Sequence, residues 1–127
     1  MPRARFPALR LEIEVPIGTS ILRCSRLLGV PEASRCAGVC ACSTCHVQIR
    51  SGAELLSPPE DDELDLLELS GEGVTPESRL GCQAKIIAEG TVDVELTEES
   101  FRAYLEDTRD ETERERAMRV WMAREPR

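Results

Sequence analysis

The sequence has few aromatic residues and no long apolar run. Aromatic side chains make up 3% of the 127 residues, so we expect one domain with a core built mainly from leucine, isoleucine, valine and alanine. No apolar stretch reaches the length of a membrane span, and the basic opening segment MPRARFPALR is not followed by the apolar run of a secretory signal. These absences argue against membrane insertion. They favour a reducing location, which is the cytoplasm, or the mitochondrial matrix if the source is eukaryotic.

Basic residues are also scarce relative to acidic ones. The chain has 16 Lys and Arg residues against 24 Asp and Glu residues, a formal charge of −8. This balance disfavours nucleic acid and anionic membrane surfaces as partners and favours a basic protein surface. The segment from Ser51 to Ser78 contains nine acidic residues and no Lys or Arg. It is either a docking surface for a basic partner or a solvated helix face.

Hydrophobic periodicity predicts a chain of short strands and helices. Strict alternation of apolar and polar residues from Leu9 to Val15 predicts a strand with one buried face. Thr19 or Ser20 would cap a helix that ends at Gly29 and packs Cys24 inward. Further strands are expected at residues 3–6, 47–50, 83–87 and 91–96.

Two more helices are expected in the second half of the chain. The segment Ser57-Pro58-Pro59-Glu60 fits a capping box that begins an acidic helix through about Leu69, with Leu64 and Leu67 turned inward. Thr97 would cap a charged helical tail that starts at Glu98.

Six cysteines are the chemically most informative residues. Cys36, Cys40, Cys42 and Cys45 lie within ten residues, and Cys82 follows 37 positions after Cys45. Disulfides between such close neighbours would need awkward geometry. Structural zinc usually takes its thiolates from two short-spaced pairs, whereas only Cys42 and Cys45 form a C-x2-C pair. A redox-active C-x2-C would need a βαβ setting and a helix N-terminus at its first cysteine, and neither is predicted.

A 2Fe-2S cluster fits this pattern better. Such a cluster takes four cysteine ligands, often three from one C-x4-C-x2-C loop and a fourth from a remote position. The loop here reads C-x5-C-x2-C from Cys36, one residue longer, and spacing alone leaves Cys40 as a competing first ligand. Cys40 would leave a single residue between the first two ligands, a poorer match to a loop that wraps a cluster. Small residues between the cysteines would let backbone N–H groups approach the sulfurs.

The segment from Cys36 to His46, CAGVCACSTCH, resembles the cluster loop of adrenodoxin-like (vertebrate-type) 2Fe-2S ferredoxins. The resemblance extends to VPIGTSIL, PPEDDELDLLE and ESRLGCQ, and so covers roughly Arg10 to Leu96. It implies an α+β fold of the β-grasp type: a mixed sheet with a short helix, an acidic helix and a helical tail. The implied division is a ferredoxin domain at residues 1–97 and a charged helical extension at residues 98–127.

The resemblance also implies a ligand set. It assigns one 2Fe-2S cluster to Cys36, Cys42, Cys45 and Cys82, and makes Cys40 a non-ligand of the kind found in the iron-sulfur-assembly (ISC-type) branch. His46, the only histidine, would link the cluster loop to the acidic region by hydrogen bonds; a merely packed residue is the alternative.

The function implied by the resemblance is electron transfer without catalysis. The protein would be a soluble one-electron carrier that takes electrons from a flavin-dependent ferredoxin reductase. Its acceptor would be a haem-thiolate monooxygenase, an oxygenase or the iron-sulfur assembly machinery. Both partners would dock on the acidic helix, through Asp61, Asp62, Glu63, Asp65 and Glu68.

Two alternatives stay open at this stage. One is a zinc-stabilised β-grasp interaction module that recruits basic partners through the acidic helix. The other concerns the tail, which departs from the family because Leu96-Thr97 and a charged segment stand where relatives often carry a proline. The tail is expected either to be a solvated helix or to bind a partner or self-associate, since Trp121 and Met122 would otherwise be exposed.

Overall fold

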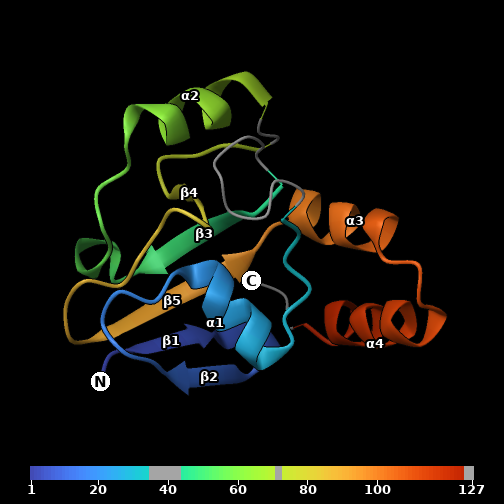
Figure 1. Cartoon of the computed structure of the whole chain (residues 1–127). Coiled ribbons are helices and arrows are strands. Elements are labelled where there is room, and N and C mark those ends of the chain that lie inside the picture. Colours follow the sequence, from blue (N-terminus) through green and yellow to red (C-terminus); the bar gives the residue numbers. More distant parts are fainter. Residues whose placement is uncertain (35–43, 71–72, 125–127) are drawn as a thin grey trace.

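A computed structural model of the chain describes residues 1–34, 44–70 and 73–124 (Figure 1). Within these ranges the chain forms strands, α-helices and two short 3-10 helices. The strands are β1 (Arg3–Phe6), β2 (Leu11–Glu14), β3 (His46–Ser51), β4 (Ser78–Leu80) and β5 (Thr91–Leu96). The α-helices are α1 (Ile21–Leu28), α2 (Asp61–Ser70), α3 (Glu98–Asp107) and α4 (Glu111–Met122), and the 3-10 helices are η1 (Pro7–Leu9) and η2 (Ala53–Leu55).

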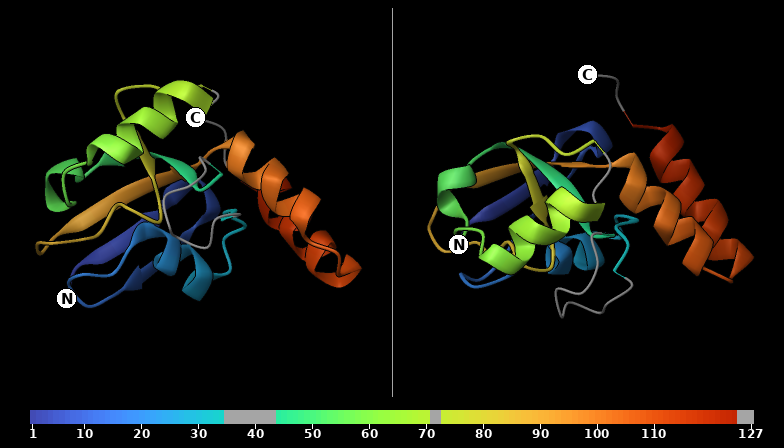
Figure 2. Two further views of the ribbon diagram at one scale, coloured as in Figure 1. Left: turned by 45° about the horizontal axis from the view of Figure 1, so that its top comes forward. Right: turned by 90° about the horizontal axis from the view of Figure 1, so that it is seen from above.

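The strands form one mixed sheet in the order β2-β1-β5-β3-β4. β1 and β5 pair in parallel, and the other neighbours are antiparallel. Helix α1 packs across one face of the sheet, and α2 lies beyond the β4 edge (Figure 1). Helices α3 and α4 run in opposite directions and project together from one side of the molecule (Figure 2). The α+β fold with a mixed sheet is therefore confirmed.

Local sequence signals account for several of these elements. The Ser20 hydroxyl accepts a hydrogen bond from the Arg23 N–H at 3.1 Å, and Gly29 ends α1 in the left-handed conformation at φ 76°. Thr97 caps α3 in the same way, accepting from the Ser100 N–H at 3.2 Å. These caps are confirmed. So is the inward packing of Cys24, whose side chain is fully buried.

Three sequence expectations were wrong in detail. The strand predicted from Leu9 begins at Leu11, because residues 7–9 form the 3-10 helix η1. The hydroxyl of Ser57 does not cap α2: it accepts from the Lys85 N–H at 3.1 Å, and α2 begins only at Asp61. Residues 83–87 contribute isolated bridges rather than a strand, and the short strand β4 was not predicted.

The acidic helix is rotated from its predicted orientation. Leu67 is buried as expected, but Leu64 is 48% exposed, so its predicted inward position was wrong. Glu63 takes the inward position instead, with 1% exposure. Its carboxylate forms a bidentate pair with the Arg79 guanidinium, at 2.7 and 3.2 Å, and accepts the Leu80 N–H at 2.9 Å. Three donors satisfy the buried charge, which is why an acid can replace a leucine there.

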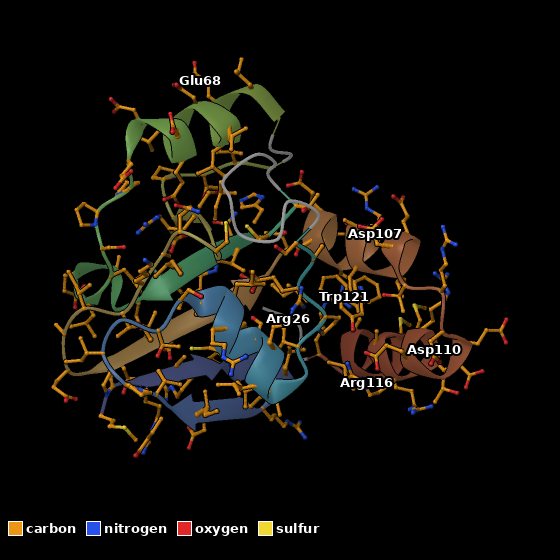
Figure 3. All side chains as sticks on the ribbon, in the orientation of Figure 1. Arg26, Glu68, Asp107, Asp110, Arg116 and Trp121 are labelled. Atoms are coloured by element: carbon orange, nitrogen blue, oxygen red, sulfur yellow. The ribbon has the colours of Figure 1, made fainter. Side chains whose placement is uncertain are left out.

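The C-terminal tail is packed rather than solvated. Phe101 and Ala117 are buried, and the Trp121 ring stacks on the Phe101 ring with centroids 4.5 Å apart. Figure 3 shows Trp121 between the two tail helices. Arg116 donates a hydrogen bond to the Gly29 carbonyl at 2.8 Å, which ties α4 to the end of α1. Met122 is 70% exposed, as expected for an apolar residue of the tail. Trp121 was also expected to be exposed but packs against Phe101 instead. Of the helices within the described ranges, none has the length and apolar character to cross a bilayer.

Candidate metal centre

Two of the predicted ligands, Cys45 and Cys82, meet beside the β3–β4 pair. Cys45 immediately precedes β3, and Cys82 follows β4 by two residues. Antiparallel pairing places His46 opposite Leu80, and the Gly81 N–H donates to the Cys45 carbonyl at 2.9 Å. Strand pairing thus brings together two cysteines that are 37 positions apart in the sequence.

The two sulfurs are spaced as neighbouring ligands rather than as a disulfide. The Sγ atoms of Cys45 and Cys82 are 3.4 Å apart, and both side chains are buried. A disulfide would bring the sulfurs to about 2.05 Å. Two thiolates on one tetrahedral metal, with bonds of about 2.3 Å, lie about 3.8 Å apart. The observed spacing therefore suits two ligands of a shared centre.

The electrostatics of this pair also suit a metal site. The hydrogen bond to Cys82, together with burial, raises the pKa of the Cys45 thiol far above its ordinary value. Two adjacent thiolates are stable there only when positive charge lies between them, which iron ions supply. Cys24 differs: burial raises the pKa of its thiol to about 11, and it packs in the main core as a neutral side chain.

The rest of the predicted ligand set lies outside the described residues. Cys36 and Cys42, together with Cys40, which the resemblance makes a non-ligand, fall in residues 35–43. Among residues 1–34, 44–70 and 73–124, no group of three or more His, Cys, Asp or Glu side chains is arranged to hold a metal ion. The four-cysteine assignment stays a prediction. The described residues contain two of the four cysteines, and their sulfurs lie close together.

Apolar side chains surround the described half of the site. Cys45 and Cys82 form a small buried cluster with Leu67 and Leu80, and the partly buried Leu22 and Leu66 pack against it. The Gln83 side-chain amide approaches the Cys82 sulfur at 3.4 Å. The leucines exclude water from the inner side of the two sulfurs.

A buried acidic residue that the sequence analysis did not identify, Glu32, lies against Gly81, the residue before Cys82. Glu32 is fully buried, and the Ser25 hydroxyl donates to its Oε1 atom at 2.6 Å, while Oε2 has no hydrogen-bond partner among the described residues. Burial raises the pKa of Glu32 to about 8, so the carboxyl group is protonated at neutral pH. The carboxyl fits because Gly81 has no side chain: a Cβ atom there would lie 2.0 Å from Oε2.

His46 connects the Cys45 end of the site to two other parts of the molecule. Its ring is fully buried; Nε2 hydrogen-bonds the Ser78 hydroxyl at 2.8 Å, and Nδ1 hydrogen-bonds the Glu99 carboxylate at 3.0 Å. Ser78 is the last residue of the acidic segment and the first of β4, so this bond joins His46 to the strand that follows the acidic helix. The bond to Glu99, on α3, was not predicted, and nothing in the local sequence pattern signals it.

The acidic helix presents most of its predicted docking residues to solvent. Asp61, Asp62, Asp65 and Glu68 are exposed, and Figure 3 shows Glu68 pointing away from the sheet. Glu63 is an exception, because it is buried against Arg79 and cannot meet a partner.

Comparison with known proteins is consistent with this site. Residues 8–86 match the family described as the 2Fe-2S iron-sulfur cluster binding domain. The chain is 45% identical over 74 residues to the mitochondrial adrenodoxin homolog of Saccharomyces cerevisiae, covering 58% of this chain and 42% of that protein. It is 37% identical over 79 residues to a 2Fe-2S ferredoxin of Pseudomonas aeruginosa, covering 62% and 70% respectively.

A solved structure extends the likeness to the fold. The crystal structure of the ISC-like 2Fe-2S ferredoxin FdxB from Pseudomonas putida matches with a TM-score of 0.68 and 34% identity, over 76% of this chain and 93% of that one. The chain belongs to the 2Fe-2S ferredoxin family, of adrenodoxin-like type and with the β-grasp fold. Like its relatives it is an electron carrier rather than an enzyme, with one 2Fe-2S cluster as its cofactor.

Proposed function

We propose that Cys36, Cys42, Cys45 and Cys82 hold the cluster and that the protein carries single electrons between two protein partners. The donor is a flavin-dependent ferredoxin reductase. The acceptor is a haem-thiolate monooxygenase, an oxygenase or the iron-sulfur assembly machinery. When bound, the cluster supplies reversible one-electron chemistry, and no substrate is transformed. We place the protein in the cytoplasm, or in the mitochondrial matrix if the source is eukaryotic.

The convergence of Cys45 and Cys82 carries this proposal. The two sulfurs come from separate strand ends, are 3.4 Å apart, and are enclosed on one side by leucines. Had these cysteines been far apart, no centre shared by the loop and the remote ligand could exist. The small apolar cluster keeps water from one side of the sulfurs, and His46 fixes the strand end that follows Cys45.

The exposed face of α2 supports the docking part of the proposal. Asp61, Asp62, Asp65 and Glu68 present four negative charges to solvent. Opposite charge on a partner speeds encounter and fixes orientation without requiring tight affinity, which suits a carrier that must dissociate after each transfer.

Metal analysis of the purified full-length protein tests the ligand set. We expect iron and acid-labile sulfide in equal amounts, and a paramagnetic signal when a ferredoxin reductase reduces the protein. Cys82→Ser should lose most of the iron, whereas Cys24→Ser, at a buried cysteine outside the proposed set, should keep it. Zinc without sulfide would instead support the interaction module and overturn the proposal.

A further inference from the structure

The first turn of α3 contacts both ends of the segment that carries three of the four proposed ligands. Thr97 is the N-cap of α3 at the end of the predicted ferredoxin domain, and Glu98 to Ser100 begin the charged extension. Figure 1 shows the start of α3 next to the start of β3, where Cys45 and His46 lie.

Ser100 holds the entry to the segment. Its side chain is fully buried, and its hydroxyl accepts a hydrogen bond from the Ala33 N–H at 2.9 Å. Ala33 is itself 2% exposed, so water cannot replace this bond. A serine in the first turn of a helix therefore fixes the backbone just before the cysteine-bearing segment.

Thr97 and Glu99 hold the exit. The Thr97 hydroxyl donates to the His46 carbonyl at 2.7 Å, and the same oxygen accepts the Ser100 N–H. The Glu99 carboxylate bonds the His46 ring at 3.0 Å, and its side chain is 15% exposed. The residue directly after Cys45 is thus fixed through both its backbone and its ring.

A rigid helix turn that fixes both ends of a loop reduces the number of conformations open to that loop. Fewer conformations mean less entropy to lose when the cysteines converge on iron. Side chains that hydrogen-bond a metal ligand directly commonly change metal affinity about 10-fold to 100-fold. Ser100 and Glu99 act one step further away, through Ala33 and His46, so we expect the lower end of that range. Helix α4 packs on α3 through the Phe101–Trp121 stack, and this contact anchors the first turn of α3.

We propose that the first turn of α3 is a clamp on the cluster loop, and that Ser100 and Glu99 are positioning residues that set cluster retention and reduction potential. This inference rests on the proposed cluster site. It assigns the C-terminal extension a role in the metal centre.

The test measures two properties of full-length variants. One is the rate at which the cluster is released to a chelator, monitored by visible absorbance, and the other is the reduction potential. We expect Ser100→Ala and Glu99→Ala to release the cluster about tenfold faster, with a shifted potential. Glu99→Gln keeps an oxygen acceptor without the charge, so it should retain the cluster better than Glu99→Ala. If Ser100→Ala fails to fold, the Glu99 variants decide the question.

Two controls separate positioning from general stability. Glu98→Ala alters an exposed neighbour on the same turn, and Glu113→Gln weakens α4 without touching Ala33 or His46. The clamp is overturned if the Ser100 and Glu99 variants have the release rates and potentials of the wild type. It is also overturned if these values change only in proportion to lost thermal stability, as in Glu113→Gln. A wild-type protein without iron and sulfide would overturn the proposed function instead.

Discussion

At the scale of single residues, the sequence reveals chemistry only where the residue type is diagnostic. Cysteines at short spacing indicate a metal or redox site whatever the fold, so Cys45 could be identified in advance from its neighbours, whereas the remote Cys82 was assigned by the family resemblance. Glu32, Glu99 and Ser100 could not, because an isolated acid or serine has many uses. Their roles arise from contacts with residues far along the chain: Ser100 with Ala33, and Glu99 with His46.

Gly81 is a residue whose substitution should be costly. A Cβ at this position would lie 2.0 Å from the Glu32 carboxylate, and that side chain is buried and hydrogen-bonded to Ser25, so it has little room to move. We expect Gly81→Ala to lower the free energy of unfolding by about 1–3 kcal/mol. In a double-mutant cycle, Glu32→Ala should relieve part of that loss. Purely additive effects in urea unfolding would contradict the close contact.

Glu113 should make stability depend on pH in the acidic range. Hydrogen bonds from Arg116, at 3.0 and 3.1 Å, and from Tyr104, at 2.6 Å, lower the pKa of Glu113 to about 2. A carboxyl whose pKa is lower in the folded state stabilises the fold above its unfolded pKa of about 4.5. That contribution is lost as the pH falls from about 4.5 towards 2.

The stability difference between wild type and Glu113→Gln measures this contribution directly. The difference should be constant between about pH 6 and pH 8 and should shrink as the pH falls below about 4.5. Trp121, the only tryptophan, reports the unfolding of the α3–α4 pair by fluorescence. A difference that stays constant down to pH 3 would show that Glu113 ionises as an ordinary exposed acid.

At the scale of elements, helix and strand existence was easier to predict than helix orientation. The caps at Ser20 and Thr97 are local, since each serine or threonine meets a backbone N–H three residues on. The capping box at Ser57 failed because its hydroxyl has a tertiary competitor, the Lys85 N–H. Likewise α2 buries Glu63 rather than Leu64 because Arg79 supplies a charge partner that no pattern within the helix reveals.

Helix α4 should depend on one aromatic contact. The Trp121 ring lies parallel to the Phe101 ring within 8°, and Phe101 is 4% exposed. Trp121→Ala removes this stack and part of the apolar area buried between the helices, a loss of roughly 2–3 kcal/mol. We expect α4 amides to exchange faster in deuterated water, while β3 and β5 keep their protection.

The neighbouring residue offers a matched control for this change. Met122 is 70% exposed, so Met122→Ala should alter stability by no more than about 0.5 kcal/mol. Equal effects of the two substitutions would mean that α4 is held by its polar contacts, such as the bond from Arg116 to the Gly29 carbonyl, rather than by the ring stack.

At the scale of the whole molecule, the fold places the acidic residues on two separate surfaces, one on α2 and one on α4. Composition alone predicts a basic partner, because the net charge is −8, but it does not say where the partner docks. The fold adds that information: α2 lies beyond the β4 edge, whereas α4 belongs to the projecting helical pair (Figure 2). Both helices carry exposed acidic residues. Cys45 immediately precedes β3 and Cys82 follows β4, the edge strand that contacts α2.

Two double variants with the same change in net charge separate docking from general electrostatics. Asp61→Asn with Asp65→Asn removes two exposed charges from α2, and Glu111→Gln with Glu115→Gln removes two exposed charges from α4. If α2 is the docking surface, the first variant should be reduced by a ferredoxin reductase roughly threefold more slowly or worse at low salt. The second should stay close to the wild-type rate.

Salt provides the internal check on that comparison. Charges act over about 30 Å at 0.01 M ionic strength but only about 3 Å at 1 M, so the gap between the two double variants should close as salt is added. Equal slowing of both variants would mean that only the total charge steers the encounter, because each variant loses the same two charges. A gap that persists at high salt would point to a direct bond between the partner and Asp61 or Asp65 rather than to steering. A slower first variant alone places the partner on α2, and a difference that salt abolishes shows that the α2 charges act by electrostatic steering.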